Sequence, residues 1–153
     1  MDLPVRKRLP HAIPQWVAEG SWFFITIKCQ PPGRNQLCQP DVGKQVLSAV
    51  IHNHEKFIWH CRLCLLMPDH LHAIIAFPRE PGMKTTMADW KRYVAVKYNV
   101  QWQRDFFDHR LRDEHQLNEK TSYILANPVR KGLCQRPEDW KWVFRPDYYH
   151  KPE

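Results

Sequence analysis

The chain has no run of about 18 apolar residues, so the sequence predicts no membrane-spanning helix. No apolar stretch follows the basic residues Arg6-Lys7-Arg8, and we therefore expect no secretory signal. The five cysteines are odd in number and lack the spacing of a disulfide framework, which favours reduced thiols in a cytoplasmic protein. No internal repeat or shift in composition divides the 153 residues, a length typical of one domain.

Positive charge is in excess along this chain. There are 23 Lys and Arg residues against 16 Asp and Glu residues, for a net charge of +7. A small basic domain suits a polyanionic partner, and nucleic acid is the commonest of these. A basic, solvated surface without any such partner has the same composition, so charge alone decides nothing. A hydrophobic content of 43% predicts a folded core rather than disorder.

The apolar patterns predict strands and helices in the order β-α-β-β-α-β-α. Strands are expected at 21–28, 57–66 and 70–77, with a short one at 106–107; helices are expected from Asp41, at 86–101 and at 113–126. Asp41 is the expected N-cap of the first helix. Asn127-Pro128 is expected to end the last helix, because the residue before a proline disfavours helical geometry. This order predicts an α+β fold, a ferredoxin-like sandwich in which helices pack on an antiparallel sheet.

Two histidines separated by one residue are the most informative feature of the sequence. His70 and His72 follow the turn signal Pro68-Asp69 and begin a short apolar strand. Because side chains alternate along a strand, both histidines point to one face and Leu71 points to the other. Two imidazoles side by side on a rigid strand are half of a divalent-metal site.

A zinc site is a competing interpretation of the same region. Cys61 and Cys64 precede His70 and His72, and such Cys and His spacing occurs in zinc knuckles. We expect these cysteines, three residues apart in an apolar strand, to face opposite sides of the sheet. No glycine turn lies between them, so buried strand cysteines are the better interpretation.

A polar stripe runs along the helix at 113–126. Its members are Gln116, Glu119 or Lys120, Tyr123 and Asn127. A tyrosine hydroxyl near a divalent cation and basic residues can act as a nucleophile. An amphipathic tyrosine at a helix edge has the same spacing, however. Tyr148 and Tyr149 are rival nucleophiles, but they lie on no such stripe.

Four motifs together resemble the REP-associated tyrosine transposases, a group within the wider single-tyrosine HUH transposases. The motifs are Met67-Pro-Asp-His-Leu-His72, Trp90-Lys91-Arg92, the segment 106–112, and Tyr123-Ile-Leu-Ala-Asn127-Pro-Val-Arg-Lys-Gly-Leu133. They occur in the family's order, and the resemblance extends from about residue 23 to 140. The histidine pair alone has modest specificity, whereas all four motifs in a chain of this length are a strong signal.

The resemblance implies a set of roles and a reaction. His70 and His72 match the metal-binding pair, Tyr123 matches the nucleophile, and Asn127 matches the position that completes the metal site. An N-cap followed by proline is another interpretation of Asn127. The resemblance also implies Mg²⁺ or Mn²⁺ as cofactor and cleavage and strand transfer of single-stranded DNA beside a hairpin, through a 5′-phosphotyrosine. The prolines and basic residues of the first 20 positions predict a basic arm at 1–20, and we expect the HUH transposase domain at 21–145 and a tail at 146–153.

Binding of single-stranded DNA needs positive charge and aromatic surfaces. The candidate phosphate contacts are the basic residues near the motifs: Lys91, Arg92, Arg110, Arg130 and Lys131. The candidate stacking residues are Trp90, Trp102, Trp140, Trp142, Tyr148 and Tyr149, although most are expected in the core. The resemblance favours a monomer, with a homodimer as the alternative, and we expect no membrane partner. A non-catalytic nucleic-acid-binding module and a hydrolytic metal nuclease are the alternative functions.

Overall fold

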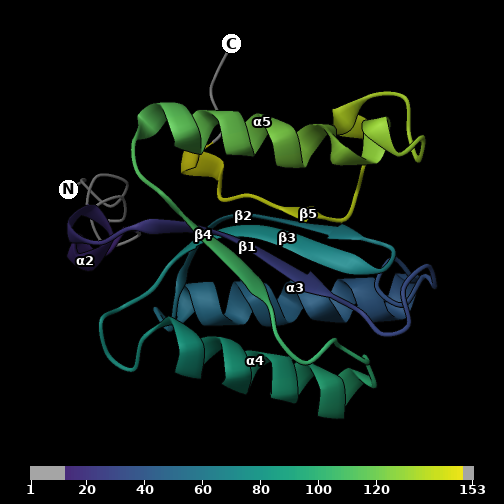
Figure 1. The fold of residues 1–153 in the computed structure, drawn as a ribbon, viewed down its shortest axis with the longest axis horizontal. Helices are drawn as coiled ribbons and strands as arrows, with labels where there is room; N and C mark the ends of the chain where they lie inside the picture. The colour runs from purple at the N-terminus through teal and green to yellow at the C-terminus, as the bar shows by residue number, and fades with distance from the viewer. Residues whose placement is uncertain (1–12, 150–153) are drawn as a thin grey trace, which may run out of the picture.

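The structure, a computed structural model, describes residues 13–149 and consists of one sheet with helices on both faces (Figure 1). The strands are β1 (Trp22–Lys28), β2 (His60–Met67), β3 (His70–Ala76), β4 (Phe107–Leu111) and β5 (Val143–Phe144). The helices are α2 (Gln15–Glu19), α3 (Pro40–Glu55), α4 (Met83–Tyr98) and α5 (Glu114–Arg130). Two 3-10 turns follow, η1 (Pro137–Asp139) and η2 (Asp147–Tyr149).

The sheet has the order β4-β1-β3-β2-β5, and every neighbouring pair is antiparallel. β1 and β2 are therefore parallel to each other with β3 inserted between them, which is the split βαβ arrangement of a ferredoxin-like fold. In Figure 1, α3 and α4 cover one face of this sheet and α5 covers the other. The predicted α+β fold, with helices on an antiparallel sheet, is confirmed. α5 and β5 extend the ferredoxin-like core.

Several element boundaries differ from the predicted ones for local reasons. α3 begins at Pro40, which occupies the first helical position, so its N-cap is Gln39 rather than Asp41. β2 begins at His60 instead of residue 57, because Phe57 has a positive φ of 61° and belongs to a turn after α3. α4 ends at Tyr98, before the left-handed residue Asn99.

The last helix does not end at Asn127-Pro128, and this prediction was wrong. α5 continues through Pro128 to Arg130. The turn after it is closed by two backbone hydrogen bonds, from the N–H of Gly132 to Val129 O (2.9 Å) and from the N–H of Leu133 to Pro128 O (2.8 Å). Gly132 has a φ of +73°, as this type of helix end requires. Asn127 is therefore a helix residue one turn after Tyr123, and the N-cap interpretation is also wrong.

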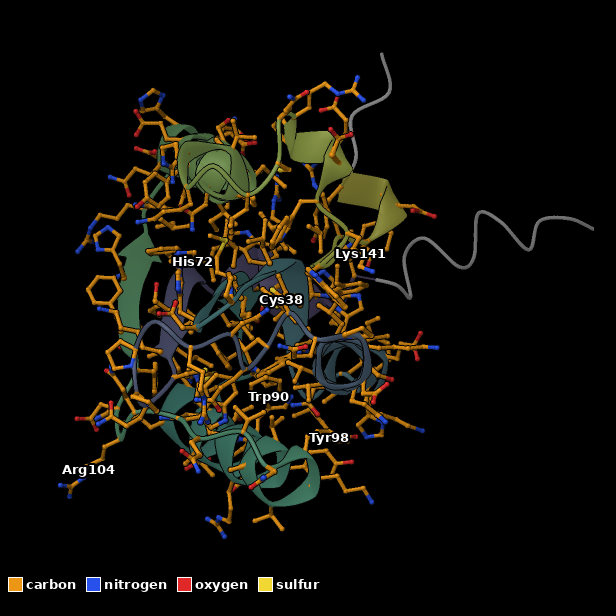
Figure 2. The ribbon with its side chains drawn as sticks, turned by 90° about the vertical axis from the view of Figure 1, so that its right-hand side faces the viewer. Cys38, His72, Trp90, Tyr98, Arg104 and Lys141 are labelled. Carbon is orange, nitrogen blue, oxygen red and sulfur yellow. The ribbon has the colours of Figure 1, made fainter. Side chains whose placement is uncertain are left out.

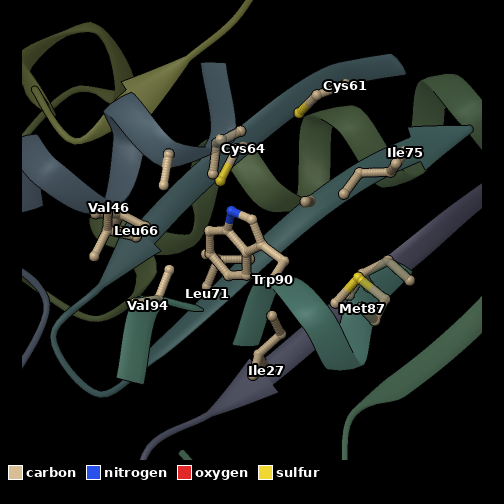
Figure 3. Close-up of a cluster of buried hydrophobic side chains, with 14 of the residues drawn as sticks. Ile27, Val46, Cys61, Cys64, Leu66, Leu71, Ile75, Met87, Trp90 and Val94 are labelled. Atoms are coloured by element: carbon tan, nitrogen blue, oxygen red, sulfur yellow. The ribbon is translucent and has the colours of Figure 1, made fainter. Parts of the chain in front are cut away.

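Two clusters of apolar side chains hold the helices on the sheet. On the α3 and α4 face, Leu71 and Ile75 of β3 pack with Trp90 of α4 (Figure 3). On the α5 face, Ile74 packs with Ile124 of α5. Alternation along β3 therefore places His70 and His72 on the α5 face. The prediction that the two histidines share one face, opposite Leu71, is confirmed.

The predicted terminal regions are only partly described. Residues 1–12 of the basic arm and 150–153 of the tail lie outside the described residues. The rest of the arm contains α2, and the rest of the tail contains η2. Within residues 13–149, no helix has the length and apolar character needed to cross a membrane.

Candidate active site between the sheet and helix α5

The two histidines lie at the start of β3 with their ring centroids 4.7 Å apart. Nδ1 of His70 is 2.8 Å from Oδ1 of Asp69, and Nδ1 of His72 is 3.0 Å from Oγ1 of Thr26 on the neighbouring strand β1. With Nδ1 held in this way, Nε2 is the nitrogen that each ring can offer to a ligand. Carboxylate and hydroxyl partners of this kind typically orient metal-binding histidines. The local geometry thus suits a metal.

Burial, nearby charge and hydrogen bonds shift the pKa values of His72 and Asp69. Burial of His72 lowers its pKa from 6.5 to about 3, and nearby positive charges, those of Arg130 and Lys120 among them, act in the same direction. The ring is therefore neutral at neutral pH and keeps a lone pair for a ligand. Burial alone would raise the pKa of Asp69, but hydrogen bonds from His70 and the Gly33 N–H lower it below its usual value.

α5 places Tyr123 beside this pair. The ring centroid of Tyr123 lies 6.4 Å from that of His72 and 6.5 Å from that of Phe24. The guanidinium carbon of Arg130 is 4.2 Å from the centre of the tyrosine ring, and Nζ of Lys120 is 5.1 Å from it. Tyr123 is 47% exposed, so a large substrate can reach it. A phosphate bound here would face a phenol, two imidazoles and two cations.

Asn127 is buried on the sheet side of the same helix, with an exposed fraction of 3%. Its Oδ1 accepts a hydrogen bond from Nη2 of Arg130 at 3.2 Å. An amide oxygen has two lone pairs, so this bond leaves one for another partner. Within residues 13–149, no three His, Cys, Asp or Glu side chains are grouped to hold a metal ion. A third protein ligand beside the two histidines would therefore be an amide, a hydroxyl or the backbone.

The zinc interpretation is wrong. Cys61 and Cys64 both lie in the cluster on the α3 and α4 face (Figure 3), whereas His70 and His72 lie on the α5 face. The expectation that these cysteines would face opposite sides was also wrong, because a register shift between Cys61 and Leu63 turns Cys64 back to the side of Cys61. Their burial is confirmed, and it raises the pKa of both thiols. All five cysteines are free, as expected.

Of the five candidate phosphate contacts, only Arg130 lies against Tyr123. Lys131 is exposed and follows directly as the C-cap of α5. Arg92 is exposed on α4, which covers the face of the sheet away from α5, and it pairs with Asp89 at 3.9 Å. Arg110 lies on β4 opposite Phe23, so alternation directs it to the face away from α5.

Lys91 is not available to DNA, and we withdraw it from the candidate contacts. Its exposed fraction is 9%, and its Nζ donates hydrogen bonds to the backbone oxygens of Gln103 (2.9 Å), Arg104 (3.0 Å) and Asp105 (3.0 Å). A buried ammonium group needs such acceptors to offset its lost hydration. Lys91 is therefore a structural residue that holds the segment before β4.

The rival tyrosines lie at the other end of the sheet. The hydroxyl of Tyr149 is 2.8 Å from Nε2 of His60, and its ring packs edge-on against Trp22. Trp22 pairs with Ala76 at one end of β3, whereas His70 is at the opposite end. Tyr148 binds His54 through its hydroxyl at 3.1 Å. Neither tyrosine is placed beside the histidine pair.

Sequence reasoning missed two residues that support the site. Thr26, the hydrogen-bond partner of His72, is 46 residues away and meets it only through the pairing of β1 with β3. Asp69 belongs to the histidine motif but was interpreted only as a turn residue. A carboxylate directly before His70 was the available signal for its role.

Comparison with known proteins confirms the resemblance that the four motifs indicated. No protein-family model matches the chain. The "Putative REP-associated tyrosine transposase" of Haemophilus influenzae is 24% identical over 141 residues, covering 81% of this chain and 79% of the relative. The "REP-associated tyrosine transposase" of Escherichia coli K12 is 24% identical over 131 residues, covering 82% and 76%. A solved REP-associated tyrosine transposase bound to a REP hairpin has the same fold, with a TM-score of 0.72, 20% identity, and coverage of 81% of this chain and 76% of that one.

Proposed function

We propose that this chain, like the REP-associated tyrosine transposases it resembles, binds hairpin-forming single-stranded DNA and cleaves and rejoins it through Tyr123. One observation carries the proposal. The ring of Tyr123 lies 6.4 Å from the ring of His72 within one chain, although 51 positions separate them in the sequence. Because a single chain supplies both groups, we also propose that a monomer is sufficient for cleavage.

The site would supply a nucleophile and positive charge for the reaction. The phenolic oxygen of Tyr123 attacks phosphorus, its proton passes to solvent, and the bond from phosphorus to the 3′ oxygen breaks. The 3′ oxygen takes up a proton and leaves as a free 3′-OH, while the 5′ phosphate stays on Tyr123. Arg130 and Lys120 lie beside the Tyr123 ring, and their charges would stabilise the oxygens of the phosphate. The covalent bond keeps the reaction reversible, so another 3′-OH can displace Tyr123 and join new strands.

His70 and His72 would hold a divalent cation through Nε2, and Asn127 would complete the set. The orientation of both rings by Asp69 and Thr26 supports this assignment. The cation would supply charge relief at the phosphate oxygens. Mg²⁺ and Mn²⁺ are both proposed, and two imidazole ligands favour Mn²⁺ because Mg²⁺ prefers oxygen ligands.

The proposed partner is a DNA strand with a hairpin. The solved structural neighbour is bound to a REP hairpin, and the net charge of +7 suits a polyanion. Arg130, which lies against Tyr123, and Lys131, which follows it as the C-cap of α5, remain proposed phosphate contacts.

A covalent-adduct assay tests the function. The protein is incubated with Mn²⁺ and labelled single-stranded DNA that carries REP-type hairpins, and a denaturing gel shows any protein–DNA adduct. Tyr123→Phe should abolish the adduct, Tyr148→Phe should leave it unchanged, and His70→Ala should reduce its rate by about 100-fold or more. An adduct that persists in Tyr123→Phe would overturn the assignment. Binding without cleavage would favour the non-catalytic module, and cleavage without an adduct would favour the hydrolytic nuclease.

A further inference from the structure

A hollow of about 400 Å³ opens beside the candidate active site, at the edge of the sheet where β1 and β4 meet. Its walls come from β1, the start of β4 and the segment before β4: Thr26, Lys28, Gln103, Arg104, Asp105, Phe106 and Phe107. Thr26 is also the hydrogen-bond partner of His72. The hollow and the histidine pair are therefore adjacent and share a wall.

The lining of this hollow combines positive charge with an exposed aromatic ring. Lys28 and Arg104 are exposed, and Figure 2 shows Arg104 reaching into solvent, away from the body of the molecule. Phe107 is 55% exposed although it is a large apolar residue. Its ring packs edge-on against Phe24 at 6.1 Å, and Phe24 in turn stacks on His72 at 5.4 Å. Cations beside a solvent-facing aromatic ring are what single-stranded nucleic acid binds.

The segment that forms the far wall is held in place from behind. The three hydrogen bonds from the Lys91 ammonium fix the backbone oxygens of Gln103, Arg104 and Asp105. The N–H of Gln103 donates to Lys28 O at 2.7 Å, which attaches the same segment to β1. Burial lowers the pKa of Lys91, and the nearby charge of Asp105 acts in the opposite direction. The positive charge of Lys91 therefore partly offsets the one carboxylate in the lining.

We propose that this hollow is a subsite for the nucleotide next to the scissile phosphate. Its base stacks on Phe107, and its phosphate contacts Lys28 and Arg104. Lys91 is a positioning residue, because it sets the segment that carries Arg104 without reaching the DNA itself. This inference rests on the proposed function for the location of the scissile phosphate, whereas the binding of a nucleotide in the hollow can be tested separately.

The test uses a five-residue thymidine oligonucleotide with a fluorescent 5′ label and 5-iodo-deoxyuridine at its centre. Binding is measured by fluorescence anisotropy in EDTA, which keeps the metal-dependent cleavage off. Phe107→Leu should weaken binding about 5- to 10-fold, as expected for loss of a stacked base. Tyr93→Leu is the matched control: Tyr93 is 50% exposed on α4, and its loss should leave binding unchanged. Under irradiation, the iodinated base should cross-link to the peptide that contains Phe107.

A second variant distinguishes a loss of DNA contacts from a folding defect. Arg104→Ala changes only an exposed side chain, and it should weaken binding and reduce its dependence on salt concentration. Unchanged affinity in both variants, or a cross-link confined to other peptides, would overturn the subsite. The adduct assay separates this failure from that of the proposed function. If the wild type forms the adduct and both variants bind the oligonucleotide normally, the subsite alone is rejected. If both variants bind more weakly but the wild type forms no adduct, the cleavage reaction alone is rejected.

Discussion

Replacing Thr26 by valine tests whether His72 is held in place for a ligand. The contact between Oγ1 of Thr26 and Nδ1 of His72 measures 3.0 Å, and the exposed fractions of the two residues are 8% and 7%. Valine keeps the β-branched shape that suits strand β1. Thr26→Val therefore removes one hydrogen bond from a buried imidazole and little else.

The size of the effect follows from burial. Leaving one buried polar group without its partner costs about 1–3 kcal/mol, so the free energy of unfolding should fall by that amount. Loss of a partner that orients a metal-binding histidine typically lowers metal affinity about 10- to 100-fold. The rate of adduct formation at low Mn²⁺ should fall in proportion, and saturating Mn²⁺ should restore part of it. Thr26→Ser keeps the hydroxyl and should recover most of both losses.

Three measurements check this prediction: urea denaturation without metal, electron paramagnetic resonance of free Mn²⁺ during titration, and the adduct rate against Mn²⁺ concentration. If Thr26→Val unfolds and binds Mn²⁺ like the wild type, the orienting role of Thr26 is refuted. Equal damage in Thr26→Ser and Thr26→Val would show that packing, not the hydroxyl, is responsible.

Three further predictions concern stability, each measured by urea denaturation. Lys91→Met should lower the free energy of unfolding by about 2 kcal/mol, because three backbone carbonyls lose a charged donor. The change Arg92→Met, at an exposed neighbouring position, should have almost no effect, and equal effects of the two substitutions would contradict this role. Gly132→Ala should lower the free energy of unfolding by about 1–2 kcal/mol because Gly132 has a φ of +73°, and Gly132→Asn should lower it less. A Gly132→Ala variant as stable as the wild type would contradict the helix-end geometry. Burial lowers the pKa of His60 from 6.5 to about 4, so between these pH values His60 is protonated in the unfolded chain and neutral in the folded one. The contribution of neutral His60 to the free energy of unfolding is fully present above pH 6.5 and should fall by about 3 kcal/mol toward pH 4. His60→Gln should remove this share of the pH dependence and leave the share of His72, whose pKa is lowered in the same direction. Stability that rises on acidification would be the opposite of the expected sign.

Short-range patterns predicted most of the fold. The order of strands and helices from β1 to α5 was correct because period 2 and period 3.6 are properties of each segment on its own, whereas the short elements α2 and β5 were not predicted. The same reasoning placed His70 and His72 on one face of β3, since only the local alternation of that strand matters. It also singled out Tyr123 on a helix whose N-cap, Asp113, accepts a hydrogen bond from the Gln116 N–H as that residue type usually does.

Predictions from local sequence patterns were wrong where contacts with distant segments determined the local structure. The register shift at Arg62 reversed the expected orientation of Cys64, because a bulge is set by the pairing of β2 with β3. α5 continued through Pro128 because the Gly132 turn closes its end and the sheet packs against its buried side. Lys91 was interpreted as a surface cation, although its three acceptors come from a segment 12 to 14 residues away.

The sequence by itself determined which side chains share a face and which residue types are present for phosphate chemistry. Only the tertiary structure decided which of them meet: Tyr123 beside His72, Thr26 behind it, and Phe107 at the edge of a basic hollow. The physical reason is the range of the interactions. Periodicity is set by neighbouring residues, whereas the pairing of β1 with β3 and the packing of α5 join segments that no local pattern connects.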